Sequence, residues 1–144
     1  WSIQDLFALG NPHIRKPENM AKVAFGSLLR IVEDSFAAAH VDRAMPDGQE
    51  KCGGKASDFQ MPGRILEFHS YVKPDSQKHG GDDARNAFSA HWSGPKPNVV
   101  EVGRVRNGYF VRRAPWDDVK PYVECIFSLS KGVRRSSAGD RYAK

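Results

Sequence analysis

The first forty residues alternate between apolar and polar positions with the spacing of α-helices. A short apolar run over 3–9 lies between Ser2, which can cap a helix, and Gly10, which can end one. Over 17–41, apolar residues recur at intervals of three and four positions and leave a charged face between them. Pro17 occupies a favourable first position for this second helix. The pattern therefore predicts one short and one long N-terminal helix.

The middle of the chain predicts loops around a strand and a short helix. Residues 45–63 contain repeated Pro and Gly breakers and are expected to form a loop. Residues 64–73 then alternate with a period of two, so Ile65 and Leu66 are expected to face opposite sides of a strand. A polar loop follows, and the apolar spacing over 83–92 indicates a short helix.

The strongest local signal predicts a β-hairpin over 99–113. Alternating β-prone residues flank the dipeptide Asn107-Gly108, which favours a two-residue turn. Because such a turn fixes the register, it also fixes which side chains share a face. The hairpin would therefore gather several arginines and one tyrosine on a single face.

The segment 122–130 gives two patterns. Its density of β-prone residues favours a strand, although Asp117 and Pro121 could instead open a helix there. Together the elements predict an α+β fold in which the short and the long N-terminal helix pack on an antiparallel sheet of about four strands. We expect a single domain over 1–131, followed by a basic, extended tail over 132–144.

Charge is distributed unequally along the 144 residues. Residues 94–144 hold eleven Lys and Arg against five Asp and Glu, a net charge of +6. Residues 1–93 hold eleven against twelve, which leaves the whole chain at +5. A segregated basic segment attracts polyanions through a salt-sensitive term that does not depend on sequence. The charge therefore points to nucleic acid or another polyanion as the partner.

The predicted hairpin supplies a face with the chemistry of a single-strand nucleic-acid site. Guanidinium groups bind phosphates in a fork, and a tyrosine ring offers a plane on which a base can stack. The expected nucleic-acid-binding residues are Arg104, Arg106, Tyr109 and Arg113, together with Arg134 and Arg135 of the tail. The alternative is a solvated face on which arginine stems cover valines. We favour a non-catalytic module that binds RNA or another polyanion, alone or within a larger ribonucleoprotein assembly.

The other hairpin face offers a set of residues that could cleave RNA without a metal ion. Glu101 would lie diagonal to Arg112, and His69 on the first strand is the candidate third member. Glu101 could take the ribose 2′-OH proton while Arg112 steadies the phosphorane and His69 protonates the leaving oxygen. In architectural outline alone, helices before a sheet, the chain resembles small metal-independent bacterial ribonucleases and related toxin domains, but no late histidine follows on the last strand. The structural alternative is an ordinary ion pair.

A third hypothesis is a structural or assembly protein with a protein partner, in which the loops make the contacts. We expect no cofactor, metal or small-molecule ligand, because no Cys or His pair has zinc-site spacing. Cys52 and Cys125 are expected as reduced thiols, with one long-range disulfide as the less favoured alternative. Trp92 and Trp116 flank the predicted hairpin, and both would frame a binding groove if they were exposed. No apolar run is long enough for a transmembrane helix.

Overall fold

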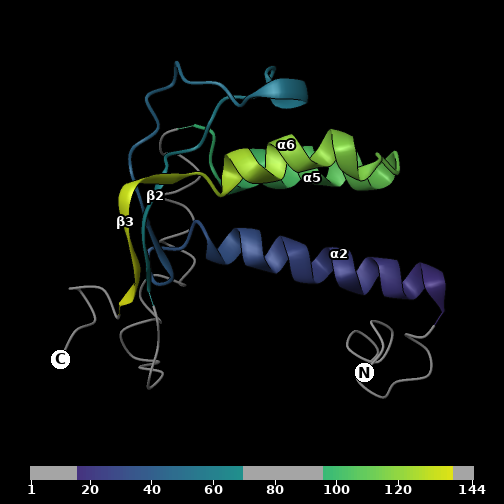
Figure 1. The fold of residues 1–144 in the computed structure, drawn as a ribbon. Helices are drawn as coiled ribbons and strands as arrows, with labels where there is room; N and C mark the ends of the chain where they lie inside the picture. The colour runs from purple at the N-terminus through teal and green to yellow at the C-terminus, as the bar shows by residue number, and fades with distance from the viewer. Residues whose placement is uncertain (1–15, 70–95, 138–144) are drawn as a thin grey trace. The chain divides into compact units, whose positions relative to one another are not determined.

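A computed structural model describes residues 16–69 and 96–137 of the chain (Figure 1). Its elements, in order, are α2 (Pro17–Asp34), β1 (Val41–Arg43), the 3₁₀ helix η1 (Gly54–Ala56), β2 (Ile65–His69), α5 (Val99–Val111), α6 (Trp116–Ile126) and β3 (Leu129–Ser137). The described residues form an α+β fold, as predicted, with three α-helices and one three-stranded sheet. The chain divides into two compact units, Trp1–Val32 and Glu33–Lys144, which are described separately below.

Helix α2 confirms the predicted long helix but ends at Asp34 and not at residue 41. The carbonyl of Ser35 accepts a hydrogen bond from the Arg43 side chain at 2.6 Å, and the chain turns before β1 begins at Val41. Apolar spacing continues through this turn, so periodicity alone could not locate the end of the helix. The predicted helices over 3–9 and 83–92 lie outside the described residues.

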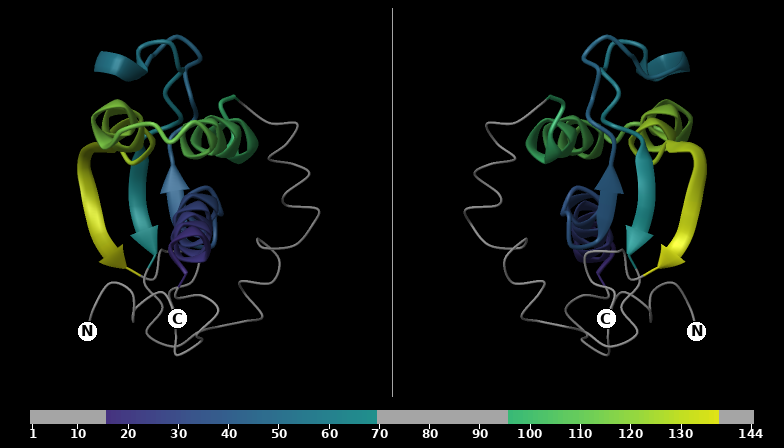
Figure 2. Two further views of the ribbon diagram at one scale, coloured as in Figure 1. Left: turned by 90° about the vertical axis from the view of Figure 1, so that its right-hand side faces the viewer. Right: turned by 90° about the vertical axis from the view of Figure 1, so that its left-hand side faces the viewer.

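The sheet differs from the predicted antiparallel sheet of about four strands. Its order is β1-β2-β3, with β1 antiparallel and β3 parallel to β2, and Figure 2 shows the three strands side by side. Strand β2 lies within the predicted strand and confirms its alternation, since Ile65 is buried and Leu66 is exposed. A parallel pair requires a long crossover. Helices α5 and α6 lie in that crossover, so the helices are not all N-terminal.

The predicted hairpin over 99–113 is wrong, because α5 occupies Val99–Val111. The Asn98 side chain accepts hydrogen bonds from the backbone of Val100 and Glu101, and the Glu101 carboxylate accepts one from the Asn98 backbone. This reciprocal capping box satisfies donors that would otherwise be unpaired at the helix start. The cap lies upstream of the valine alternation, and it begins a helix that continues through the Asn-Gly pair.

The predicted strand over 122–130 is also wrong in most of its length, because α6 extends to Ile126 and β3 begins only at Leu129. The alternative helix is the correct one, with Asp117 in its first turn, where the helix dipole favours negative charge. The buried residues of α6 are Tyr122, Cys125 and Ile126, spaced by three and one positions. They lie on one helical face, although the same segment also alternates with a period of two.

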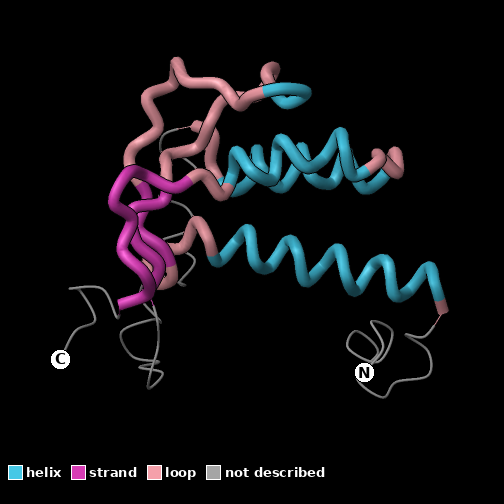
Figure 3. Tube along the Cα trace, in the orientation of Figure 1, coloured by secondary structure: helices cyan, strands magenta, loops and turns pink. Residues whose placement is uncertain are grey.

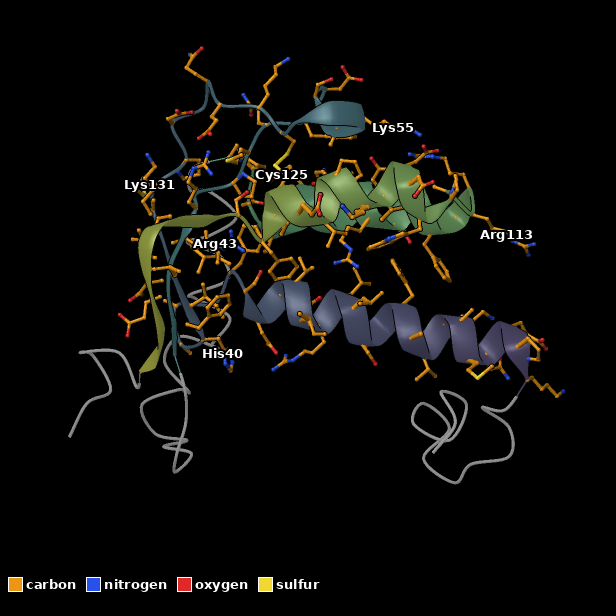
Figure 4. All side chains as sticks on the ribbon, viewed as in Figure 1. His40, Arg43, Lys55, Arg113, Cys125 and Lys131 are labelled. Carbon is orange, nitrogen blue, oxygen red and sulfur yellow. A yellow bond between two sulfur atoms is a disulfide. The ribbon has the colours of Figure 1, made fainter. Side chains whose placement is uncertain are left out.

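A disulfide joins the loop before β2 to α6. Cys52 and Cys125 are bonded with their Cα atoms 5.4 Å apart, so the less favoured alternative for the cysteines is the one observed (Figure 4). In the same loop, the centroid of the Phe59 ring lies 4.9 Å from that of the Tyr122 ring and 6.4 Å from that of the Tyr109 ring. Loop, α5 and α6 therefore share one aromatic core.

Arg43 connects the sheet to the surrounding chain. Its guanidinium donates to the carbonyls of Gly63 and Ile126 at 2.9 Å each and to the Ser35 hydroxyl at 3.0 Å, besides the bond to the Ser35 carbonyl. It also stacks on the Phe36 ring at 4.3 Å. Burial lowers the pKa of Arg43 to about 10, which still leaves it charged near neutral pH. This arginine is a structural residue.

Candidate functional site

Helices α5 and α6 are joined by a tight turn at the end of the pair away from the sheet (Figure 3). The Arg113 backbone N–H donates to the Phe110 carbonyl at 3.0 Å, and that of Ala114 donates to the Tyr109 carbonyl at 2.9 Å. These two bonds form a Schellman motif, in which the left-handed position usually belongs to glycine. Here Arg113 occupies it, with φ of 51°. A bulky residue in this conformation is strained, and strained positions cluster at functional sites.

Large apolar side chains are exposed around this turn. We call Phe110, Val111, Arg112, Arg113 and Trp116 the turn surface. The exposed fraction is 70% for Val111, 60% for Trp116 and 37% for Phe110. Figure 4 shows Arg113 pointing away from the helix pair. The turn surface therefore combines two guanidinium groups with exposed apolar and aromatic side chains.

The two arginines of the turn surface have no carboxylate partner among the described residues. Within 16–69 and 96–137, neither Arg112 nor Arg113 pairs with a carboxylate, and Arg112 stacks over the Tyr109 ring at 4.5 Å. The nearby acidic residue Asp118 accepts a hydrogen bond from Lys55 at 2.5 Å, which raises the pKa of that lysine. Lys55 thus neutralises one of the two carboxylates in the first turn of α6.

The residues predicted to bind nucleic acid do not share one face. Arg104 and Arg113 are exposed, whereas Arg106 and Tyr109 are each only 6% exposed and belong to the buried side of α5. Arg134 and Arg135 lie on β3, and their side chains fall outside the described part of the structure. Arg104 and Arg113 were predicted to share one surface only because the sequence pattern was interpreted as a hairpin, and that hairpin is not formed.

The residues proposed for RNA cleavage are not brought together. Glu101 lies in the first turn of α5 and Arg112 follows its last turn, eleven residues later, which is about 16 Å along a helix. The Glu101 carboxylate accepts hydrogen bonds from Lys96 and the Asn98 backbone. Burial alone would raise its pKa, but these bonds outweigh burial and lower it. His69 ends β2, and its side chain is outside the described residues. The diagonal pair on which the hypothesis relied is therefore absent.

Other candidate sites carry less chemistry. A cavity of about 250 Å³ beside β1 is lined by Phe36, Arg43 and Pro97 among others, but the Arg43 donors in it are already bonded within the protein. In the described part of the chain, no group of three His, Cys, Asp or Glu residues could hold a metal ion. None of the described helices is long and apolar enough to span a membrane.

Sequence reasoning missed two members of the turn surface, Phe110 and Val111, because the hairpin assigned them to strand faces. The groove expected between Trp92 and Trp116 required both to be exposed. Trp116 is exposed, and Trp92 lies outside the described residues, so that expectation stays a prediction. Comparison of the chain with protein-family models, with curated proteins and with solved structures found no match.

Proposed function

We propose that this protein binds a polyanion, with single-stranded RNA as the expected class, through the turn surface between α5 and α6. The observation that carries the proposal is an arginine in a left-handed position beside a second arginine and an exposed tryptophan. Guanidinium groups suit phosphates, and an exposed indole can stack on a base of any sequence. The basic excess of residues 94–144 adds a long-range attraction for the same partner.

The conformation of Arg113 separates a binding role from a structural one. Glycine adopts a positive φ without a steric penalty, so Arg113→Gly is expected to stabilise the fold by about 1 kcal/mol. The same change removes one phosphate contact. Loss of RNA affinity together with a gain in stability cannot result from damage to the fold.

The proposal is tested with a fluorescently labelled single-stranded RNA, in EDTA, by anisotropy over a series of salt concentrations. Arg113→Gly should weaken binding by about three- to tenfold and reduce the slope of log affinity against log salt by about 0.7. Trp116→Ala should weaken binding by about fivefold or more, because stacking on one base is lost. Asp117→Asn should strengthen binding, because it removes a negative charge next to the turn surface.

The matched control is Lys22→Ala, which removes one positive charge from an exposed position on α2. If the turn surface is the site, this variant binds RNA nearly as well as the wild type. Equal losses in Lys22→Ala and Arg113→Gly would mean that only net charge matters. Unchanged binding in Arg113→Gly and Trp116→Ala would refute the proposed surface. The length of the RNA after incubation reports separately on cleavage, and binding to anionic vesicles in place of RNA would identify a membrane surface as the partner.

An assembly protein remains a second proposal, supported by apolar side chains on β2. Leu66 is 43% exposed and Phe68 is 37% exposed, and both lie on the strand face opposite the buried Ile65. Neighbouring apolar residues in this arrangement favour association with another protein surface. Sedimentation equilibrium of the wild type and of Leu66→Ser tests this: self-association that the substitution abolishes supports it, and a monomer at all concentrations contradicts it.

A further inference from the structure

Arg106 lies in the middle of the buried stripe of α5. Val102, Arg106 and Tyr109 follow one another at intervals of four and three positions, and all three are buried. Arg106 is only 6% exposed as a whole residue, and partial burial of its guanidinium lowers the pKa of this group. In the part of the chain that the structure describes, no carboxylate or carbonyl accepts a hydrogen bond from it. A charged group is thus buried without the partners that normally compensate burial.

No carboxylate within 16–69 and 96–137 supplies a negative charge to this guanidinium. Its electrostatic neighbour is the Tyr122 hydroxyl, and burial raises the pKa of Tyr122 far above neutral pH. Tyr122 is therefore protonated and uncharged. The carboxylate on the same helix, Glu101, is bonded to Lys96 and to its own helix cap. Burial lowers the pKa of Arg106, but an arginine keeps its proton near pH 7 even so.

The guanidinium is also not sealed from outside. In the described part of the chain, the Arg106 nitrogens are not among the fully enclosed side-chain atoms that lack a hydrogen bond. Because these nitrogens have no hydrogen-bond partner either, they retain a small contact with solvent.

We propose that Arg106 is the recognition residue of a second binding site, which takes the oxyanion group of a small molecule, a phosphate or a carboxylate. A guanidinium binds both groups with two parallel hydrogen bonds, which would supply the missing counter-charge. Arg106 lies two positions, or about 200° around the helix, from the exposed Arg104, so this site is distinct from any exposed face of α5. The inference does not depend on RNA binding, and it opposes the expectation that the chain has no small ligand.

The test compares inorganic phosphate and acetate with chloride at equal ionic strength. Thermal unfolding of the wild type should shift to higher temperature with phosphate or acetate, because a ligand bound only to the native state stabilises it. Titration followed by the NMR signal of the Arg106 Nε–H should saturate over the same concentration range. The anion with the lower dissociation constant identifies the preferred group. A thermal shift no larger than that in chloride, with an unmoved Nε–H signal, would overturn the proposal.

Two substitutions of the same kind locate the site. Arg106→Met keeps the length of the side chain and removes the charge, and it should weaken oxyanion affinity by about ten- to a hundredfold. In chloride alone it should unfold at the same or a higher temperature than the wild type, since it removes an uncompensated charge. Lys22→Met removes one positive charge from an exposed position outside the turn surface and should leave oxyanion affinity unchanged. If Lys22→Met weakens oxyanion affinity as much as Arg106→Met does, the proposal is wrong. The Nε–H titration uses the wild type, so the test stands even if Arg106→Met fails to fold.

Discussion

Removal of the Cys52–Cys125 disulfide is expected to destabilise the fold strongly. The bond closes a loop with a sequence separation of 73 residues. Both cysteines are buried, at 3% and 5% exposure, so the bond lies within the core formed by the loop and α6. The substitution that removes it without leaving a free thiol is the double variant Cys52→Ala, Cys125→Ala.

The size of the effect follows from the entropy that the loop closure removes from the unfolded chain. For a loop of about 74 residues this entropy corresponds to about 4.5 kcal/mol at 25 °C. A domain of this size is stable by roughly 5–15 kcal/mol, so the double variant should lose a large share of its free energy of unfolding. With a typical dependence on urea, the unfolding midpoint should fall by about 2 M.

Urea unfolding, followed by tryptophan fluorescence and circular dichroism, measures this loss. Free energies extrapolated to water should be compared, because the uncrosslinked unfolded chain also exposes more surface and changes the urea dependence. Wild-type protein under reducing conditions serves as the control that keeps both sulfur atoms. A loss below about 1.5 kcal/mol in both samples would refute the loop-entropy reasoning. It would mean that contacts such as the Phe59 ring on Tyr122 hold the loop on α6 without the bond.

Two further changes test the packing of the fold. Gly63→Ala should lower the free energy of unfolding by about 2 kcal/mol or more in urea, because an added Cβ would overlap the Ala44 backbone carbonyl. Gly26→Ala, in the interior of α2 with open space around it, should instead raise it by about 0.5–1 kcal/mol. Equal effects at the two glycines would contradict the structure. Asn98→Ala should lower the free energy of unfolding by about 1–2 kcal/mol by removing the cap of α5, whereas Asn98→Asp should retain most of the stability. An unchanged free energy of unfolding in Asn98→Ala would show that Glu101 and the cap do not hold the start of the helix.

The sequence predicted the elements whose pattern admits one interpretation. Helix α2 and strand β2 follow from clear periods of about three to four and of two, and the α+β class follows from them. The segment 99–113 was misread because valines at alternate positions and an Asn-Gly pair satisfy a hairpin locally. The decisive group was a single side chain, Asn98, whose capping role could be recognised only if a helix was already considered.

Tertiary bonds decided what local pattern could not. The segment 122–130 fits either a strand or a helix, and the disulfide from Cys125 together with the buried Tyr122 and Ile126 selects the helix. Cysteine spacing does not reveal pairing, so neither the bond nor its effect on α6 was accessible from sequence. The candidate site shifted for the same reason: once α5 is helical, Arg104 and Arg106 lie on different faces, while Arg113 moves to the turn.

Arg43 and Arg106 provide an internal comparison that bears on the proposed oxyanion site. Arg43 donates four hydrogen bonds to carbonyl and hydroxyl oxygens, which shows how this chain compensates a buried guanidinium when its role is structural. Arg106 is 6% exposed as a residue, and it donates no such bonds to the described residues. A structural role would predict a loss of stability on replacement by methionine at both positions. We expect the loss at Arg43 alone, since Arg43→Met leaves several buried carbonyl oxygens without a donor, whereas Arg106→Met removes a charge that nothing in the described chain compensates. Urea unfolding of the two variants therefore separates an arginine that holds the fold from one that awaits a ligand, and a large loss in both would assign Arg106 to the fold.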